Sequence, residues 1–275
     1  MEIENQVNEA VVKALFLLKQ RLETLESVAV AFSGGVDSTL LLAVAHEVLG
    51  KRVLALTIRS CAFPAKEIDE AIRFCRERGI THEVIDFDPL AIAQFTENPP
   101  DRCYHCKRAM FVVIRDFARS HGINEIIEGS NLDDDGDYRP GRKALVELGI
   151  KSPLREAGLT KCEVRECLRE LGLAVWRKPS AACLASRFPY GERITREALM
   201  RVEKGERYLA KLLPPETPLR VRSHGDIARI EVSADGYCAL IAHRAEITTA
   251  LKRIGFAYVA LDLEDFRTGR MNEVL

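Results

Sequence analysis

The chain has 275 residues, of which 47% are hydrophobic and 29% charged, and its formal net charge is −1 at pH 7. This length and composition suit an ordinary globular protein with one large domain or a main domain and an appendage. A net charge so close to zero excludes a global basic field that would attract nucleic acid or anionic lipid, so we expect neither partner. The acidic amino-terminal residues lack the basic region of a signal peptide, and no apolar run is long enough to span a bilayer. We therefore expect a cytoplasmic protein.

The first two thirds of the chain alternate short apolar runs with amphipathic segments. Helices are predicted over 8–25, 38–50, 65–79 and 104–120, and strands over 28–32, 52–58, 81–87 and 124–130, with a short strand or turn at 149–153. This alternation predicts an α/β fold with a parallel sheet and helices on both faces. Ligands bind at the carboxyl ends of the strands in such sheets, so Ser33, Thr57 and Ser130 should share one crevice.

The pattern changes after about residue 190. A helix is predicted over 195–213, a Pro-rich break follows, and strands are predicted over 219–224, 227–232 and 258–266 with a helix over 236–253 between the last two. These segments predict a small carboxyl-terminal α+β domain. We therefore expect one domain over 1–185 and a second, for substrate binding or oligomerisation, over 186–275.

The stretch "AFSGGVDSTLLL" follows the first predicted strand and opens a helix. Gly34 and Gly35 would let the backbone approach an anion closely, while Ser33 and Ser38 offer hydroxyl donors beside the free N–H groups of the helix amino terminus. The stretch lacks the lysine of the P-loop NTPase pattern and is not the G-x-G-x-x-G of dinucleotide folds. Asp37 in an anion cradle favours phosphates accompanied by a divalent cation. The alternative is a strand–helix turn without a ligand.

Eight cysteines in an intracellular chain are not expected to form a disulfide framework. We interpret four of them as packing residues: Cys75, Cys162, Cys167 and Cys238. Cys61 follows a strand and is ambiguous.

The remaining three cysteines are candidate ligands. Cys103 and Cys106 form a C-x-x-C pair at the start of a helix, where the dipole and basic neighbours favour thiolates. Cys183 lies in a Pro- and Gly-flanked loop far along the chain. Together they could hold three corners of a [4Fe–4S] cluster with the fourth iron open. A zinc site, which needs a fourth ligand, and a merely reactive thiol are the alternatives.

The sequence Ser-Gly-Gly-Val-Asp-Ser (33–38) resembles the pyrophosphate-binding loop of the ATP pyrophosphatase (PP-loop) superfamily, whose fold is of the adenine nucleotide alpha hydrolase type. The resemblance implies ATP, Mg²⁺ and adenylation of a substrate oxygen, which is then displaced. It does not choose between amide formation and sulfur insertion.

Four further stretches, "RCYHCK", "EGSNLDDDGDYRPG", "KPSAACLASRFPYG" and "LDLEDFRTGRMNE", resemble the LarE family over nearly the whole chain. The family implies a sulfur transferase in the biosynthesis of the nickel-pincer nucleotide cofactor of lactate racemase. It would adenylate a carboxylate of pyridinium-3,5-biscarboxylic acid mononucleotide and convert it to a thiocarboxylate. The resemblance also implies a homo-oligomer, and a sulfide or persulfide donor as a further partner.

Two branches of that family use sulfur differently. One sacrifices the sulfur of a single cysteine, which matches Cys183, and turns over once. The other has three cysteines and a [4Fe–4S] cluster. This chain has cysteine at all three positions, Cys103, Cys106 and Cys183, and so resembles the cluster branch. Cys183 and Asp37 are the expected catalytic residues in either case.

Other residues are expected at the site from their positions. The Gly129–Ser130 turn should contact the nucleotide, and Thr57 should lie near the adenosine. One carboxylate of Asp133–Asp135 would assist Mg²⁺ or orient the substrate. The alternative is that the acidic run is a solvated loop, which we expect for Asp135 and Asp137.

An anion site for the small-molecule nucleotide substrate is also expected. Arg187 and Arg193 flank the cysteine loop and could hold a phosphate or carboxylate by paired hydrogen bonds. Arg220 and Arg222 lie two apart on one predicted strand and so share a face. The family pattern suggests a phosphate site there, and the alternation of a small solvated sheet explains the pair equally well. Arg267, in the tail that matches the family, is a further candidate.

Three other classes of protein are possible. A PP-loop tRNA thiolase would need a basic surface for tRNA, for which a near-neutral chain offers little. An amidotransferase related to NAD synthase would give the three cysteines no role. An iron–sulfur carrier or ATP-binding scaffold would leave Asp37 and the arginines without purpose.

Overall fold

The computed structural model of the chain describes residues 2–136, 140–179, 182–214, 217–267 and 269–274. Its internal contacts divide the chain into two compact units. Unit 1 contains Met1–Arg59, Ala65–Phe87 and Cys103–Ser180, and unit 2 contains Ser60–Pro64, Asp88–Arg102 and Ala181–Leu275. The predicted division into 1–185 and 186–275 stays a prediction.

Unit 1 is built on a four-stranded sheet in the order β3-β2-β1-β4. The strands are β1 (Val28–Ala31), β2 (Val53–Arg59), β3 (Thr81–Asp86) and β4 (Glu125–Ile127). Every pairing is parallel, with Val28 of β1 opposite Val53 on one side and Glu125 on the other. The predicted parallel α/β fold is confirmed. Because the chain leaves β1 toward β2 and later returns to its opposite side as β4, the point where the strand order reverses lies between β1 and β4.

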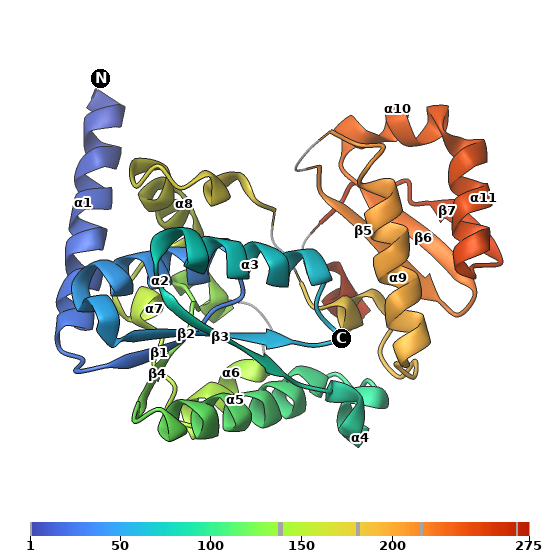
Figure 1. Cartoon of the computed structure of the whole chain (residues 1–275). Helices are drawn as coiled ribbons and strands as arrows, with labels where there is room; N and C mark the ends of the chain where they lie inside the picture. Colours follow the sequence, from blue (N-terminus) through green and yellow to red (C-terminus); the bar gives the residue numbers. More distant parts are fainter. Residues whose placement is uncertain (1, 137–139, 180–181, 215–216, 268, 275) are drawn as a thin grey trace. The chain divides into compact units, whose positions relative to one another are not determined.

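Helices cover both faces of this sheet (Figure 1). On one face lie α2 (Val36–Leu49) and α3 (Ala65–Arg78), and on the other lies α5 (Arg102–Ser120). Helices α1 (Glu2–Glu23) and α8 (Lys161–Glu170) pack on α2. As a result α2 is apolar almost all round, which is the pattern of a buried helix, and Leu40, Leu41 and Leu42 are fully buried.

Unit 2 contains the small α+β structure that was predicted. Its sheet has the order β5-β6-β7, with β5 (Leu219–His224) antiparallel to β6 (Ile227–Val232) and β7 (Tyr258–Leu261) parallel to β6. Helix α9 (Arg196–Leu209) packs on β5. The predicted helix 236–253 is two helices, α10 (Ala234–Ala242) and α11 (Arg244–Ile254), because the backbone leaves the helical region at His243.

Several short elements were not predicted. They are α4 (Ala93–Thr96), α6 (Gly141–Glu147) and α7 (Pro153–Glu156), and the 3-10 turns η1 (Gly50–Arg52), η2 (Pro89–Ala91), η3 (Leu132–Gly136), η4 (Ala174–Arg177), η5 (Leu184–Arg187) and η6 (Arg270–Val274). The segment predicted at 149–153 makes one parallel bridge, from Lys151 to Ile127, before α7 begins. None of the helices in the described ranges combines the length and the apolar character needed to cross a membrane.

Candidate functional site

The loop between β1 and α2 has the geometry of an anion cradle. Gly34 has φ +69°, and a Cβ there would lie 3.2 Å from the carbonyl oxygen of Glu67, so the turn needs glycine for its conformation and its close packing. Gly35 is the N-cap of α2. The hydroxyl oxygens of Ser33 and Ser38 lie 3.1 Å apart across the loop. The first-turn N–H groups of α2 and two hydroxyls therefore lie within one short loop, and these are the donor groups that an anion site uses.

Asp37, in the first turn of α2, is held by two partners from elsewhere in unit 1. The side-chain amide of Asn131 donates to its Oδ1 at 3.0 Å, and the ammonium of Lys161 forms an ion pair with its Oδ2. Lys161 was not predicted to take part. A sequence signal existed, because Lys161 is the first residue of α8, where a cation opposes the helix dipole and is normally unfavourable.

The end of β4 lies directly against the start of α2. A Cβ on Gly129 would lie 2.8 Å from the backbone nitrogen of Ser38 and 3.1 Å from the carbonyl carbon of Asp37. The next residue, Ser130, donates from its backbone N–H and its hydroxyl to the buried carboxylate of Glu128, at 3.0 and 2.9 Å. The structure therefore brings the predicted turn and the predicted loop together, with the Ser130 hydroxyl bonded to Glu128.

Glu128 was not predicted to lie at the site, although it is the first residue of "EGSNLDDDGDYRPG". Besides Ser130, its carboxylate accepts the Ser152 hydroxyl at 2.6 Å and lies 3.9 Å from the ammonium of Lys107. Lys107 directly follows Cys106. Glu128 thus connects the carboxyl end of β4 to the first turns of α5.

Thr57 lies in β2 and is 2% exposed. Its hydroxyl donates to the carbonyl of Phe32 at 2.8 Å, and Nε2 of His82 lies 2.8 Å from the same hydroxyl oxygen. Because the Thr57 hydroxyl already donates its proton to Phe32, it accepts a hydrogen bond from His82, whose ring proton therefore lies on Nε2. Burial lowers the pKa of His82, which favours the neutral ring. The expected contact between Thr57 and adenosine stays a prediction.

The acidic run is tied into the fold. Asp133 accepts the backbone N–H of Lys161 at 2.9 Å, and Asp134 is buried and accepts the N–H of Asn131 at 3.0 Å. Asp135 forms an ion pair with Arg142 at 2.6 Å. These contacts hold Asn131 and Lys161 beside Asp37, which gives the run a supporting role. Asp137 lies outside the described residues.

The exposure of the cysteines separates packing residues from accessible thiols. Cys75 and Cys167 are fully buried, as predicted, whereas Cys162 and Cys238 are exposed, so their assignment as packing residues was wrong. Cys162 follows the N-cap of α8, about 140° around the helix from Cys167 at 100° per residue. The face that carries Cys167 also carries the buried Val164 and Leu168. Cys103 is exposed, and Cys106 and Cys183 are half-buried.

Alkylation of the native protein should follow this division. Burial raises the pKa of Cys75 and Cys167 to about 12, so at pH 8 these thiols are protonated as well as inaccessible. Brief treatment with iodoacetamide, followed by peptide mass spectrometry, should label Cys103, Cys162 and Cys238 and leave Cys75 and Cys167 unmodified until denaturant is added. Labelling of Cys75 at the rate of Cys162 would contradict the burial described here.

In unit 2, Arg187 holds the loop that carries Cys183. Its guanidinium donates to the carbonyls of Ala182 and Cys183 at 2.9 and 3.1 Å and pairs with both carboxylate oxygens of Glu206 at 2.9 and 3.0 Å. The side chain is 2% exposed. Arg187 therefore fixes the backbone on both sides of the Cys183 side chain, and its predicted contact with substrate stays a prediction.

A second set of contacts anchors the same loop from the segment before the cysteine pair. Arg102, which precedes Cys103, is buried and donates to the carbonyl of Ala185 at 3.1 Å. Asn98 is fully buried with φ +58°, an uncommon conformation for a residue with a side chain. Its amide donates to the carbonyl of Pro189 at 2.7 Å. Two segments far apart in sequence are thus joined through buried polar contacts.

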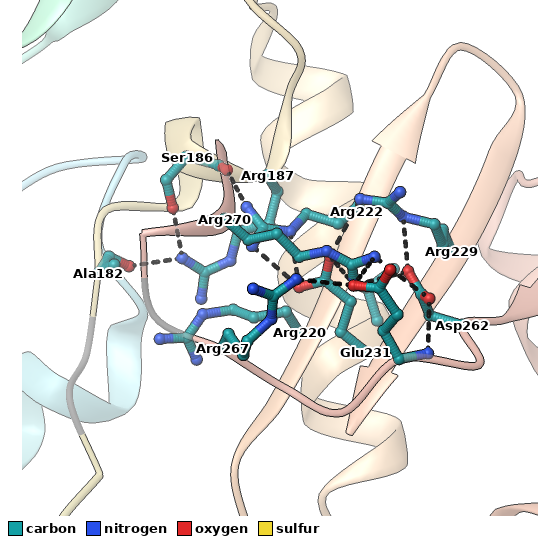
Figure 2. Close-up of polar contacts among 12 residues, drawn as sticks. Ala182, Ser186, Arg187, Arg220, Arg222, Arg229, Glu231, Asp262, Arg267 and Arg270 are labelled. Carbon is teal, nitrogen blue, oxygen red and sulfur yellow. Dashed lines mark hydrogen bonds and ion pairs between the residues drawn. The ribbon is translucent and has the colours of Figure 1, made fainter. Parts of the chain in front are cut away.

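An arginine-rich cluster lies on the sheet of unit 2. Arg222, Arg229 and Arg270 converge on the carboxylates of Glu231 and Asp262 (Figure 2). Glu231 is fully buried, and Arg222 also donates to the carbonyl of Ser186 at 2.6 Å, which links the cluster to the cysteine loop. Burial raises the pKa of the Asp262 carboxyl, but the backbone N–H of Glu264 and the charge of Arg270 outweigh it and leave that pKa lowered.

The other predicted arginines differ in their surroundings. Burial, together with the charges of Arg187 and Arg222, lowers the pKa of Arg220 to about 10, although the charges of Glu206 and Glu231 oppose the shift. Arg267 is 56% exposed and pairs with Glu264 and Glu273 at 2.8 and 3.1 Å. Arg193 is exposed. Arg220 therefore lies near two further guanidiniums, those of Arg187 and Arg222, which are the kind of donor that holds carboxylates and phosphates.

Replacing Arg222 by methionine should destabilise the protein. It removes the partner that holds Oε2 of the buried Glu231, and breaking a buried pair costs roughly 3 kcal/mol of unfolding free energy. The matched control is Arg267→Met, which removes two exposed ion pairs and should cost less than about 1 kcal/mol. Urea denaturation of both variants measures the difference, and equal losses would show that the Glu231 pair is not the stabilising contact.

The three candidate cluster ligands belong to different units, Cys103 and Cys106 to unit 1 and Cys183 to unit 2. Within the described ranges, no group of three or more His, Cys, Asp or Glu side chains is arranged to hold a metal ion. The ligand set therefore stays a prediction. Cys103 is exposed and Cys106 and Cys183 are half-buried, and cysteine thiolates are the donors that iron–sulfur clusters use.

Comparison with known proteins gives one family match and three informative relatives. A family model described as NAD synthase matches residues 10–110. A pyridinium-3,5-bisthiocarboxylic acid mononucleotide synthase from Lactiplantibacillus plantarum is 39% identical over 255 residues, covering 92% of this chain and 92% of that protein. An uncharacterized protein from Synechocystis is 40% identical over 94% of this chain and 96% of its own length. A tRNA-specific 2-thiouridylase from Rhizobium leguminosarum is 26% identical over 65% of this chain.

Proposed function

We propose a function from the premise that this chain belongs to the LarE family, in which the Lactiplantibacillus synthase is 39% identical over 92% of the chain. The protein is proposed to be an ATP-dependent sulfur transferase. It would adenylate a carboxylate of pyridinium-3,5-biscarboxylic acid mononucleotide and convert it to a thiocarboxylate in nickel-pincer cofactor biosynthesis. The observation that carries the proposal is the Ser33–Ser38 loop at the β1–β4 switch point, with Asp37 held at its edge.

The loop would bind the pyrophosphate portion of ATP. The N–H groups of the first turn of α2 and the hydroxyls of Ser33 and Ser38 are donors of suitable kind and placement. Asp37 would hold Mg²⁺, which would neutralise phosphate charge. In the reaction, a substrate carboxylate oxygen forms a bond to the α-phosphorus and the bond to the bridging oxygen breaks. The departing pyrophosphate would stay hydrogen-bonded to the same N–H and hydroxyl donors, which stabilise the charge that develops on it.

The arginine-rich cluster would bind the substrate's phosphate or second carboxylate. The arginines are Arg187, Arg220, Arg222, Arg229 and Arg270, and their carboxylate partners are Glu206, Glu231, Asp262 and Glu264. Five positive and four negative groups leave a net charge of +1. Such a surplus supports binding of an anion. Arg193 and Arg267, which are exposed, are candidates for the outer part of that site.

The sulfur source is proposed to be a [4Fe–4S] cluster held by Cys103, Cys106 and Cys183. When bound, the cluster would supply the sulfur that displaces AMP from the activated carboxylate. The contacts of Arg102 and Arg187 support the assignment, because they fix the loop around Cys183 and tie it to the residue before Cys103. The alternative is that the Cys183 thiolate itself is the sulfur donor and is consumed.

An anaerobic experiment tests these points together. The purified protein is reconstituted with iron and sulfide, and iron, acid-labile sulfide and visible absorption are measured. ATP, Mg²⁺, excess sulfide and the dicarboxylate nucleotide are then added, product is quantified, and the intact protein is weighed.

Four irons per chain, several turnovers and an unchanged protein mass are the expected results. Absence of a cluster with loss of the mass of hydrogen sulfide at Cys183, which leaves dehydroalanine, would instead establish the sacrificial mechanism. Failure to release AMP in the presence of the dicarboxylate nucleotide would overturn the proposed activity.

A tRNA thiolase is the less favoured function. The thiouridylase relatives are 26% identical and share about half of their own length with this chain. Adding unmodified tRNA in place of the nucleotide to the same assay should give no thiolated product.

A further inference from the structure

Lys178 makes three contacts at the turn of the nucleotide loop. Its ammonium donates to the carbonyl of Gly34 at 3.0 Å and to carboxylate oxygens of Glu67 and Glu70, the latter at 2.7 Å. The side chain is 16% exposed. No sequence pattern singled out this lysine, which stands at the start of the "KPSAAC" stretch. It joins three separate elements: the loop, α3 and the segment after α8.

The backbone of Lys178 is itself held in place. Arg165 of α8 donates to the carbonyl of Lys178 at 2.9 Å and also to that of Trp176. Glu67 and Glu70 lie three residues apart on α3 and so share a face. Burial raises the pKa of Glu70, but the hydrogen bond and charge of Lys178 outweigh it and leave that pKa lowered. The lysine is therefore held both at its backbone carbonyl and at its side-chain nitrogen.

The contact with Gly34 restrains an unusually free peptide. The peptide that joins Gly34 and Gly35 is flanked by two glycines, which permit rotation of its plane at little steric cost. In a trans peptide the C=O and N–H point in opposite directions. When Lys178 holds the Gly34 oxygen, the Gly35 N–H must therefore point away from Lys178. In the structure this N–H donates to the hydroxyl of Ser33 at 3.4 Å, which is a long hydrogen bond.

We propose that Lys178 is a positioning residue for the nucleotide: by holding the Gly34 carbonyl, it keeps the Gly35 N–H directed at the pyrophosphate group. The inference rests on the proposed function, since it assumes that the loop binds ATP. It assigns to the segment before Cys183 a part in forming the ATP site. Lys178 itself need not touch the phosphates.

The test measures binding of Mg²⁺ with the ATP analogue that has a methylene group between the α- and β-phosphates, by calorimetry. Lys178→Met should weaken binding about 10-fold or more, which is the scale of one lost oriented donor to an anion. Lys178→Gln, one atom shorter and uncharged, is a second variant should the methionine protein not fold. Lys66→Met is the matched control, since Lys66 pairs with the same Glu70 at 3.6 Å from a position 85% exposed, and its binding should be unchanged.

A double-mutant cycle separates peptide orientation from a structural role. Gly35 has φ −80°, which alanine adopts without strain, and the nearest atom to its Cβ would be the Ser33 hydroxyl at 3.3 Å. Rotating the 34–35 peptide would carry this φ to a positive value that alanine disfavours. Gly35→Ala should therefore hold the peptide in place, and the loss caused by Lys178→Met should shrink at least about 3-fold in that background.

The outcomes are distinguishable. Wild-type protein that does not bind the analogue overturns the proposed function, whatever the variants do. Wild-type binding with equal binding by folded Lys178→Met or Lys178→Gln overturns the role of Lys178. A loss of the same size with and without Gly35→Ala overturns the orientation mechanism, and the expected shrinkage supports it.

Discussion

Gly129→Ala should abolish ATP binding, although it adds a single methyl group at a site outside the nucleotide loop. The new Cβ would lie 2.8 Å from the backbone nitrogen of Ser38 and 3.1 Å from its Cα. Backbone atoms at the start of a buried helix cannot move aside as the end of a flexible side chain can. The end of β4 and the start of α2 must separate, at a cost of roughly 1–3 kcal/mol of unfolding free energy.

The loss of ATP affinity should exceed what the loss of stability alone would cause. Separation of β4 from α2 moves Ser38 and Asp37, and it also draws Asn131 away from Asp37. We expect binding of the ATP analogue to fall below detection by calorimetry in protein that is still folded at 20 °C by circular dichroism.

Gly122→Ala is the matched control for this variant. Nothing lies within 4 Å of its Cβ position, but its φ is +75°, so it carries backbone strain of about 1–2 kcal/mol without a clash. It should lower stability by a similar amount and leave ATP affinity unchanged. Normal ATP binding by Gly129→Ala would show that the end of β4 does not shape the loop.

Cys183→Ala should abolish thiocarboxylate formation while sparing the first half of the reaction. Both candidate sulfur sources require this thiol, either as a cluster ligand or as the donor, so product should fall by at least about 10³-fold. ATP binding and substrate-dependent exchange of pyrophosphate into ATP should persist, because the loop and Asp37 are unchanged. Formation of labelled product and pyrophosphate exchange are measured on the same sample. Cys162→Ala, at an exposed thiol on α8, is the control and should retain full activity.

Cys103→Ala distinguishes the two sulfur sources. If the three cysteines hold a cluster, this variant should lose it, retain ATP binding and make no product. If Cys183 is sacrificed, the variant should still make up to one product per chain. A variant that keeps full cluster content would show that Cys103 is not a ligand.

The sequence was sufficient to predict the parts of the fold that repeat a local pattern. Apolar runs at 28–32 and 52–58 became adjacent parallel strands, and the glycine pair after the first of them became the turn before α2. The bend at His243 was missed because helical periodicity continues through it. Cys162 was misassigned because a helical pattern does not by itself tell which face is buried when the flanking residues are charged.

The residues that support the site were harder to predict because their partners are distant in the chain. Lys161 lies 124 positions from Asp37, and Lys178 lies 144 positions from Gly34. No local rule connects a lysine to a carboxylate or carbonyl at that separation. The packing of α8 and η4 on α2 brings these lysines to the nucleotide loop. Glu128 was missed for a different reason, since a charged residue directly after a strand usually faces solvent.

The segments that make up unit 2 limit which fragments and chimeras of this protein can fold. That unit takes residues Ser60–Pro64 and Asp88–Arg102 from within the amino-terminal part of the chain. There, the carbonyl of Ala62 accepts the N–H of Leu184, and that of Thr96 accepts the N–H of Ile194. A fragment expressed from residue 186 onward would lack both segments. The carboxyl-terminal structure is thus not an independent domain. To transfer it to another enzyme, or to exchange it between relatives, one must transfer the two internal segments of this chain as well.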